Sequence, residues 1–458
     1  MLPSALLRDH PAARPSFPAP TRPAAPRRPT NLVLLIPDGL GPAGAALARE
    51  YRRHRDGPSE LALDPHHIGS VRTHAADHRI TDSAAAATAY ATGTKTRNGA
   101  VATDPEGRPL GTLLEGARAN GMATGLVATS RLTHATPAAF SAHTPDRDRE
   151  GDIARQQVEQ GIDVLLGGGL RHFRAPDDAD GPSPLRRAER RGYQVVHTAD
   201  GLDGAGTGPL LGLFADDHMA YEVDRPGTDQ PSLAAMARAA LDRLADHGNG
   251  FVLVVEGSRI DHAAHVHDPA TQLREVLAFD RAASALLSAV DRTDTLVVSV
   301  ADHETGGLTL GRTHDGAAAC TWHPSALTEV SASTAVVAET LRDLHAEHAG
   351  SPLLPDAVAE VIHHFIGVQD LSARERDRLA TADAAPSTVA ALLNRRARLD
   401  WTTDGHTATD VSLCATGPGA ARLAGHHDNT AVGRILATLL DVDLSAVTAR
   451  GRSRAAGS

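Results

Sequence analysis

Residue types that bind metal ions follow four apolar runs of the sequence. They are Asp38 after NLVLLIP, Glu256 at the end of GFVLVVE, Asp302 and His303 after DTLVVSVA, and His134 and Thr136 after GLVAT. In open α/β sheets, functional side chains gather beyond the carboxyl ends of the strands. Each of these residues alone is explained as a turn or loop residue, but the same ending on four runs predicts one shared site.

A second group combines residue type with spacing. In the segment EGSRIDHAAHVHD, Asp261 and His265 are four residues apart, so on a helix they share one face and can chelate one ion. Asp and His ligands are typical of zinc sites, although a solvated, charged helix is the better explanation of this segment taken alone. His406, after a glycine in TTDGHTATD, adds a weak signal. His267 and Asp268 are offset from this face, and we expect them at the surface.

One serine lies at the start of an alanine-rich stretch, residues 81–99, which reads TDSAAAATAYATGTKTRNG. A serine in that place is usually a helix cap, which contributes about 1 kcal/mol. The functional alternative uses the same place, because N–H groups and the helix dipole attract an anion there. Ser83 would then be a nucleophile whose hydroxyl needs a base or a metal ion. With the predicted ligands, the stretch indicates a phosphate and a zinc ion.

The apolar runs also predict the fold. They are rich in Val and Leu and nearly continuous, as expected of strands buried on both faces of a parallel sheet. The predicted strands are 31–37, 125–129, 163–169, 250–257, 294–302 and 410–417, and helical patterns between them include 110–121, 233–248 and 272–290. This alternation predicts an α/β fold, a three-layer αβα sandwich around a large mixed, mainly parallel sheet.

Three regions depart from this alternation. Residues 1–30 are rich in Pro, Ala and Arg and predict a disordered tail before a catalytic domain over 31–458. Residues 174–210 are rich in Asp, Arg and Gly, and we expect surface loops there. Residues 311–400 have a helical pattern without clear strands, and we predict an inserted subdomain near the mouth of the site.

Composition excludes several classes of function. A net charge of −11 and an aromatic content of 3% argue against a specific nucleic-acid partner. No run is long enough to span a membrane, and the N-terminus lacks the apolar core of a signal peptide, so from this sequence we expect a cytoplasmic protein. The two cysteines suit neither a disulfide framework nor a thiolate metal site, and Cys414 is interpreted as a small buried residue.

Six blocks of the sequence resemble the alkaline phosphatase family. They are PDGLGP, TDSAAAATAYATGTKTRNG, ATPAAFSAHTPDR, VEGSRIDHAAHVHD, VSVADHETGG and GHTATDVSLCATGPGA, in family order between about residues 31 and 435. The TDSA block is highly specific, and Lys95, the only lysine of the chain, fills its lysine position. The resemblance implies a metal-dependent enzyme that hydrolyses small-molecule phosphate monoesters.

The resemblance also implies a role for each matching residue. Ser83 is implied to be the nucleophile that becomes a phosphoserine, and Arg147 to grip two phosphate oxygens. The implied metal ligands are Asp38, Asp302 and His303 for one Zn²⁺, Asp261, His265 and His406 for a second Zn²⁺, and Asp38, Thr136 and Glu256 for a third ion, usually Mg²⁺.

Two family-variable positions carry histidine. His134 stands where some relatives have Asp, and His262 where some have Lys, so the pair resembles the two-histidine variants of the family. We therefore predict a third site that is more open to zinc or another transition metal than a magnesium-only site.

The missing signal peptide departs from this family, whose members are commonly exported. Either an upstream start encodes one, or this member works inside the cell. Homodimers are common in the family, but the sequence shows no interface. Two alternatives to a general phosphatase stay open: a dedicated phosphatase of a small molecule, such as a phosphorylated aminoglycoside precursor, and a non-catalytic relative that only binds metal and phosphate. Phosphodiesterases and sulfatases share parts of the layout, whereas the full serine block and Arg147 favour monoesters.

Overall fold

The computed structural model describes residues 28–174, 181–311, 321–347, 355–381 and 385–456. Residues 1–27 lie outside them, so the predicted tail is described only from residue 28 onward. Across the described residues, a ten-stranded sheet has the order β14-β2-β13-β8-β1-β7-β3-β4-β6-β5. Their bounds are β14 Gly425–Asp428, β2 His67–Arg72, β13 Val411–Thr416, β8 Thr295–Val300, β1 Asn31–Ile36, β7 Phe251–Glu256, β3 Ala123–Arg131, β4 Val164–Gly168, β6 Leu210–Leu213 and β5 Gln194–Val196.

The sheet is mixed but mainly parallel, as the sequence predicts. Within its described strands, only β13 runs opposite to the rest, antiparallel to both β2 and β8. The central strands β8, β1, β7 and β3 pair in parallel, for example Leu34 with Val254 and with Val298. Every residue of β1, β7 and β8 is buried, which explains why these strands read as continuous apolar runs.

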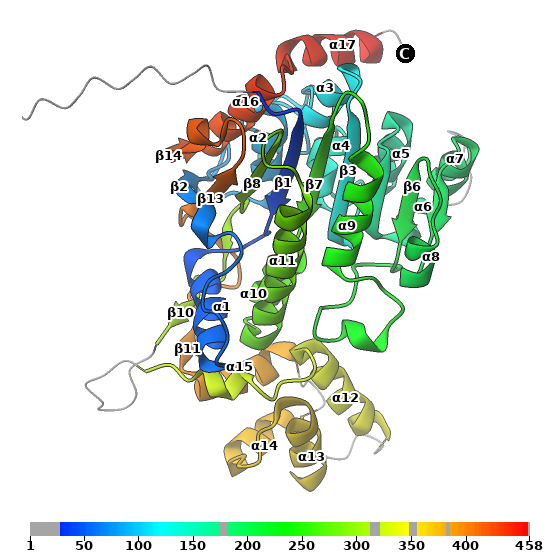
Figure 1. Cartoon of the computed structure of the whole chain (residues 1–458). Coiled ribbons are helices and arrows are strands. Elements are labelled where there is room, and N and C mark those ends of the chain that lie inside the picture. Colours follow the sequence, from blue (N-terminus) through cyan, green and yellow to red (C-terminus); the bar gives the residue numbers. More distant parts are fainter. Residues whose placement is uncertain (1–27, 175–180, 312–320, 348–354, 382–384, 457–458) are drawn as a thin grey trace, which may run out of the picture.

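Helices cover both faces of the sheet and complete the three layers (Figure 1). Val33 and Leu35 of β1 share a core with helices on one face, and Leu32 and Leu34 share a core with helices on the other. The first face carries α1 Pro42–His54, α9 Leu233–Leu244 and α11 Pro269–Ala289. The second carries α2 Ser83–Thr92, α3 Leu113–Ala119, α4 Ala135–Ser141, α5 Glu150–Gln160 and α16 Asn429–Leu439.

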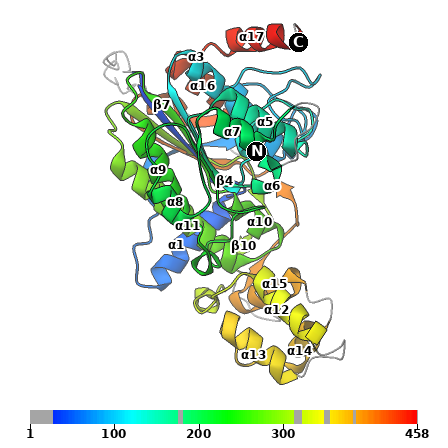
Figure 2. The same ribbon diagram turned by 90° about the vertical axis from the view of Figure 1, so that its right-hand side faces the viewer.

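Further helices lie beyond these layers. Helices α12 Thr334–Glu347, α13 Pro355–Ile366, α14 Ala373–Leu379 and α15 Pro386–Ala397 stand together at one end of the molecule in both views (Figures 1 and 2). They lie in the chain between two short paired strands, β10 Thr309–Leu310 and β11 Leu399–Asp400. These helices contain half of the residues in the range 311–400, for which the sequence predicts an inserted subdomain. Helix α17, Leu444–Ala456, ends the described chain, in which no helix is both long and apolar enough to cross a bilayer.

The expectation of loops over 174–210 is wrong for most of its described part. Helix α6, Leu170–Phe173, precedes this region, which then contains α7 Pro184–Arg190, β5 and α8 Ala199–Asp203. These elements are short, and β5 is an edge strand with no buried residue, so it lacks the apolar run that marks a central strand. The side chains of Ser183 and Thr198 cap α7 and α8.

Candidate active site

The predicted site residues meet where the central strands end. Asp38 lies two residues after β1, Glu256 is the last residue of β7, and Asp302 lies two residues after β8. His134 directly precedes α4 in the loop after β3, and its side chain makes no capping hydrogen bond. The parallel pairing of these strands brings their carboxyl ends to one edge of the sheet. Asp38, Glu256 and Asp302 are almost fully buried there.

Helix α2 presents Ser83 to this edge. All ten of its residues are buried, and its alanines allow α16 to approach so closely that a Cβ on Gly433 would lie 2.5 Å from the carbonyl oxygen of Ala89. The interpretation of Ser83 as the helix cap is wrong. Asp82 is the N-cap residue, and its Oδ1 accepts a hydrogen bond from the Ala85 N–H at 2.9 Å. The Ser83 hydroxyl is therefore not needed for capping.

The Ser83 hydroxyl faces a buried histidine. Its Oγ lies 3.1 Å from Nε2 of His303, and the same nitrogen lies 3.2 Å from Asp302 Oδ2 and 3.7 Å from Asp38 Oδ1. Burial, and then the neighbouring His406, lower the pKa of His303 well below its usual value. A neutral imidazole can act as a metal ligand or accept a proton. His303, Asp38 and Asp302 offer ligand atoms that all lie within 4.8 Å of one another.

A second set of ligand-type residues adjoins the first. Helix α10, Arg259–His265, places Asp261 and His265 on one face as the spacing predicts, with His265 Nε2 3.3 Å from Asp261 Oδ2. His406 Nε2 lies 3.2 Å from His265 Nε2 and 3.7 Å from Asp261 Oδ1. Although burial opposes it, the Asp261 carboxylate raises the pKa of His265 to about 9. His406 also forms a metal-compatible group with Asp261 and His303.

A two-stranded ladder holds these two sets together. Strands β9, Glu304–Thr305, and β12, His406–Thr407, pair antiparallel with His406 opposite Thr305. The Nδ1 atom of His406 lies 2.8 Å from the carbonyl oxygen of Thr81, just before the Asp82 cap. This contact leaves Nε2 of His406 facing Asp261 and His265.

A third group contains Asp38, His134 and Glu256, whose ligand atoms also lie within 4.8 Å of one another. Among the described residues, both carboxylate oxygens of Asp38, His134 Nδ1, Thr136 Oγ1 and Glu256 Oε1 are buried without a hydrogen-bond partner. Burial, and then Asp302, raise the pKa of Asp38, and burial raises that of Glu256 to about 7. Unpaired buried oxygens are costly unless a cation binds them, so this donor set fits a metal ion.

Arg147 lies between the serine helix and the third group. Its Nη1 donates to Asp82 Oδ2 at 3.0 Å, and its Nη2 lies 3.0 Å from His134 Nε2. Its backbone N–H donates to the Gly99 carbonyl, and the Gly99 N–H donates to Asp82 Oδ2. The guanidinium is thus held beside the start of α2, where an anion would lie.

His262 lies beside His134, as the two-histidine resemblance implies, with ring centroids 5.3 Å apart. The structure adds a third ring that no pattern in the sequence indicates. His218 lies 4.4 Å from the His262 ring and 5.4 Å from the His134 ring, centroid to centroid. Its Nδ1 accepts from the backbone N–H of Arg131 at 3.2 Å. His218 follows the buried strand β6. Because functional side chains gather beyond the carboxyl ends of strands, this position would indicate His218 once the short strand is known.

Two expectations near the site have different outcomes. Asp268, expected at the surface, is 1% exposed. Its carboxylate caps α11 through the Thr271 N–H at 3.0 Å and accepts from the Thr334 N–H at 2.9 Å, which compensates its burial. Cys414 is buried as expected, and burial raises the pKa of its thiol to about 12.

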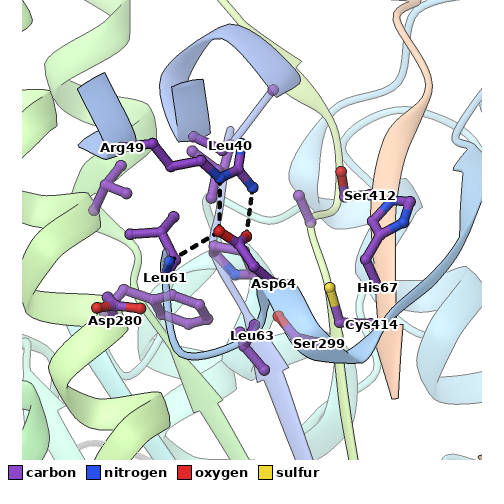
Figure 3. Close-up of a pocket in the computed structure, with 16 residues that line it drawn as sticks. Leu40, Arg49, Leu61, Leu63, Asp64, His67, Asp280, Ser299, Ser412 and Cys414 are labelled. Carbon is purple, nitrogen blue, oxygen red and sulfur yellow. Dashed lines mark hydrogen bonds and ion pairs between the residues drawn. The ribbon is translucent and has the colours of Figure 1, made fainter. Parts of the chain in front are cut away.

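Cys414 faces a separate pocket on the side of α1 (Figure 3). Arg49 crosses it in a two-point ion pair with Asp64, at 2.8 and 2.5 Å. Pro37 and Ala301, which line the pocket, directly precede the predicted ligands Asp38 and Asp302. None of the predicted site residues lines this pocket itself.

Comparisons with known proteins identify the family of the chain. A sequence model described as "Alkaline phosphatase" matches residues 29–442. Repressible alkaline phosphatase of Saccharomyces cerevisiae is 37% identical over 91% of this chain and 82% of its own length. Streptomycin-6-phosphate phosphatase of Streptomyces griseus is 38% identical over 78% of this chain and 89% of its own length. The crystal structure of Thermus thermophilus alkaline phosphatase superposes with a TM-score of 0.80 at 34% identity, covering 91% of this chain and 92% of that one.

Proposed function

The chain belongs to the alkaline phosphatase family and is a phosphoric monoester hydrolase, and on that premise we propose that it works through a phosphoserine on Ser83. The observation that carries this proposal is the place of the Ser83 hydroxyl. It stands at the first position of α2 and 3.1 Å from His303, among three groups of metal-type ligands. A serine hydroxyl that is not needed to cap its helix and faces these ligand-type residues can serve as the nucleophile.

Three ions would complete the site. Asp38, Asp302 and His303 would hold one Zn²⁺, and Asp261, His265 and His406 would hold the other. Asp38, Thr136 and Glu256 would hold the third ion, which is usually Mg²⁺ in this family. When bound, the ions supply positive charge for the attacking and the leaving oxygen of an in-line displacement.

The chain's own residues then carry two displacement steps. The Ser83 oxygen attacks phosphorus as the ester bond to the leaving oxygen breaks, which leaves phosphate on Ser83, and the proton lost from the Ser83 hydroxyl is matched by the one that the leaving oxygen takes up to depart as an alcohol. Water then attacks that phosphorus, the bond to Ser83 Oγ breaks, and the serine recovers its proton as inorganic phosphate leaves. Arg147 has further N–H groups besides those bound to Asp82 and His134, and they would bind two phosphate oxygens. The N-terminus of α2 adds its N–H groups and dipole.

The third site would also accept zinc or another transition metal. His134 offers a ring nitrogen together with Asp38 and Glu256, and His262 stands beside it. Imidazole nitrogen favours transition metals, whereas Mg²⁺ prefers an all-oxygen set.

A second candidate is a dedicated phosphatase of one phosphorylated small molecule, such as an aminoglycoside phosphate. The similarity to streptomycin-6-phosphate phosphatase favours it, and the net charge of −11 would attract a cationic substrate. The comparable identity to general alkaline phosphatases keeps it second. Turnover of phosphorylated aminoglycosides, streptomycin 6-phosphate among them, no faster than that of simple monoesters would exclude an aminoglycoside-specific enzyme.

The deciding experiment is hydrolysis of p-nitrophenyl phosphate by purified protein, before and after chelation and restoration of zinc and magnesium. We expect activity that disappears with chelator, returns with metal and is absent from Ser83→Ala. Zinc and phosphate binding without turnover of monoesters would instead identify a non-catalytic relative. Bis-p-nitrophenyl phosphate serves as the diester control, and faster cleavage of it would overturn the monoesterase assignment.

A further inference from the structure

Thr305 lies where the two proposed zinc-ligand sets meet. It is fully buried on the short strand β9, directly opposite His406 in the ladder with β12. Its backbone N–H donates to the Gly39 carbonyl at 3.1 Å, next to Asp38. Gly39 has a positive φ of +72°, and a Cβ there would lie 2.8 Å from the Thr305 hydroxyl oxygen. The backbone around Thr305 is therefore closely fitted to the loop that carries Asp38.

The hydroxyl of Thr305 contacts one residue from each set. Its Oγ1 lies 2.5 Å from Asp261 Oδ1 and 3.2 Å from His303 Nδ1. A carboxylate can only accept, so the single hydroxyl proton of Thr305 is donated to Asp261. The oxygen of Thr305 then accepts from an N–H at His303 Nδ1. That tautomer leaves the lone pair of His303 on Nε2, the atom that faces Ser83 Oγ and Asp302.

We propose that Thr305 is a positioning residue that couples the two zinc sites, orienting Asp261 and fixing His303 in the tautomer that binds metal through Nε2. The proposal rests on the proposed function, because it takes Asp261 and His303 as zinc ligands. Groups that orient metal ligands commonly change metal affinity by about 10- to 100-fold when removed. Loss of this one hydroxyl would therefore weaken the binding of both zinc ions together.

The chain offers matched variants for the test. Thr305→Val keeps the shape and removes the hydroxyl, whereas Thr305→Ser keeps the hydroxyl. Thr124→Val is the control. Thr124 is also fully buried, and its hydroxyl also donates to a carboxylate, that of Asp163, at 3.2 Å. It lies near the start of β3, at the end of the strand away from the proposed site. Thermal unfolding of the metal-free proteins reports whether each variant folds. If Thr305→Val does not fold, Thr305→Ala replaces it.

Zinc affinity is measured by competition with a chelating dye, and Co²⁺ titration with visible spectra reports ligand geometry. We expect Thr305→Val to bind both zinc ions about 10- to 100-fold more weakly with an altered Co²⁺ spectrum. Thr305→Ser and Thr124→Val should stay within about threefold of wild type. A Thr305→Val protein with the zinc affinity and Co²⁺ spectrum of wild type would overturn this proposal and leave the proposed function standing. A wild-type protein that binds no zinc would overturn the proposed function and this inference with it.

Discussion

The carboxylate of Asp82 accepts a hydrogen bond from Arg147 at 3.0 Å and, through its other oxygen, caps the helix that begins at Ser83. One side chain therefore sets the position of both the proposed nucleophile and the proposed phosphate-binding guanidinium. This division of tasks separates helix stability from chemistry. The cap belongs to Asp82, and the Ser83 hydroxyl is left to face His303.

Replacement of Ser83 by alanine should remove activity without destabilising the fold. We expect the kcat of Ser83→Ala to fall by at least about a thousandfold, because the nucleophile is lost. Its free energy of unfolding should stay within about 0.5 kcal/mol of wild type, because Asp82 still caps α2. Asp82→Ala is the contrasting variant and should lose about 1 kcal/mol or more of stability. Urea unfolding and p-nitrophenyl phosphate kinetics check both, and a Ser83→Ala protein as unstable as Asp82→Ala would contradict the capping argument.

Neutralising Asp82 should weaken phosphate binding while the helix stays capped. Asparagine is as good an N-cap as aspartate, so Asp82→Asn keeps the cap but loses the charge that holds Arg147. We expect inorganic phosphate to inhibit this variant roughly tenfold less strongly, as measured by competitive inhibition. Asp104→Asn is the control, because Asp104 holds Arg108 at 2.7 Å, outside the site. Unchanged phosphate inhibition in Asp82→Asn would show that Arg147 does not depend on this pair.

The central part of the fold was predictable from the sequence because its strands are buried on both faces. Strands β1, β7 and β8 are apolar throughout, and the polar residues at their ends stand out against them. The edge elements were not predictable in this way. Strand β14 is Gly425–Asp428, with sequence GHHD, and β2 contains one buried residue, so neither has an apolar run. Their pairing depends on neighbours distant in sequence.

The ligand-type residues of the site were predictable for the same reason, whereas the residues that orient them were not. Thr305 and Asp82 are ordinary polar residues whose importance lies in contacts made only after folding. His218 follows a strand of four residues, too short to be recognised by its pattern. Spacing predicted that Asp261 and His265 face one another, because both lie on one helix.

The third site should retain a transition metal in the presence of excess magnesium. After dialysis of wild type against millimolar Mg²⁺ with trace Zn²⁺, we expect metal analysis to find more than two equivalents of zinc, because His134 supplies a nitrogen ligand. His134→Asp should replace the third zinc by magnesium, since carboxylate oxygen suits Mg²⁺. His426→Asp, on the edge strand β14, is the control and should behave as wild type. Strict magnesium occupancy of the third site in wild type would contradict the prediction.

The pKa of Glu256 should make the metal-free protein less stable as pH rises. Burial raises this pKa from 4.5 to about 7, so between these values the folded state keeps a proton that the unfolded state has released. The contribution of Glu256 to stability is thus favourable at low pH and is lost as pH rises through about 7. Glu256→Gln has no such proton, and in chelator it should gain roughly 3 kcal/mol relative to wild type between about pH 4 and pH 8. Urea unfolding at each pH measures this difference.

Glu275 provides the control that separates burial from metal binding. Its pKa is also raised to about 7 by burial, but it belongs to none of the three metal-type groups found among the described residues. Glu275→Gln should therefore show the same pH-dependent gain with chelator and with zinc and magnesium. For Glu256→Gln the gain should disappear when the metals are present, because a bound ion stabilises the ionised carboxylate of wild type and the amide supplies no charge. An identical pH dependence of Glu256→Gln with and without metals would show that Glu256 is not a ligand.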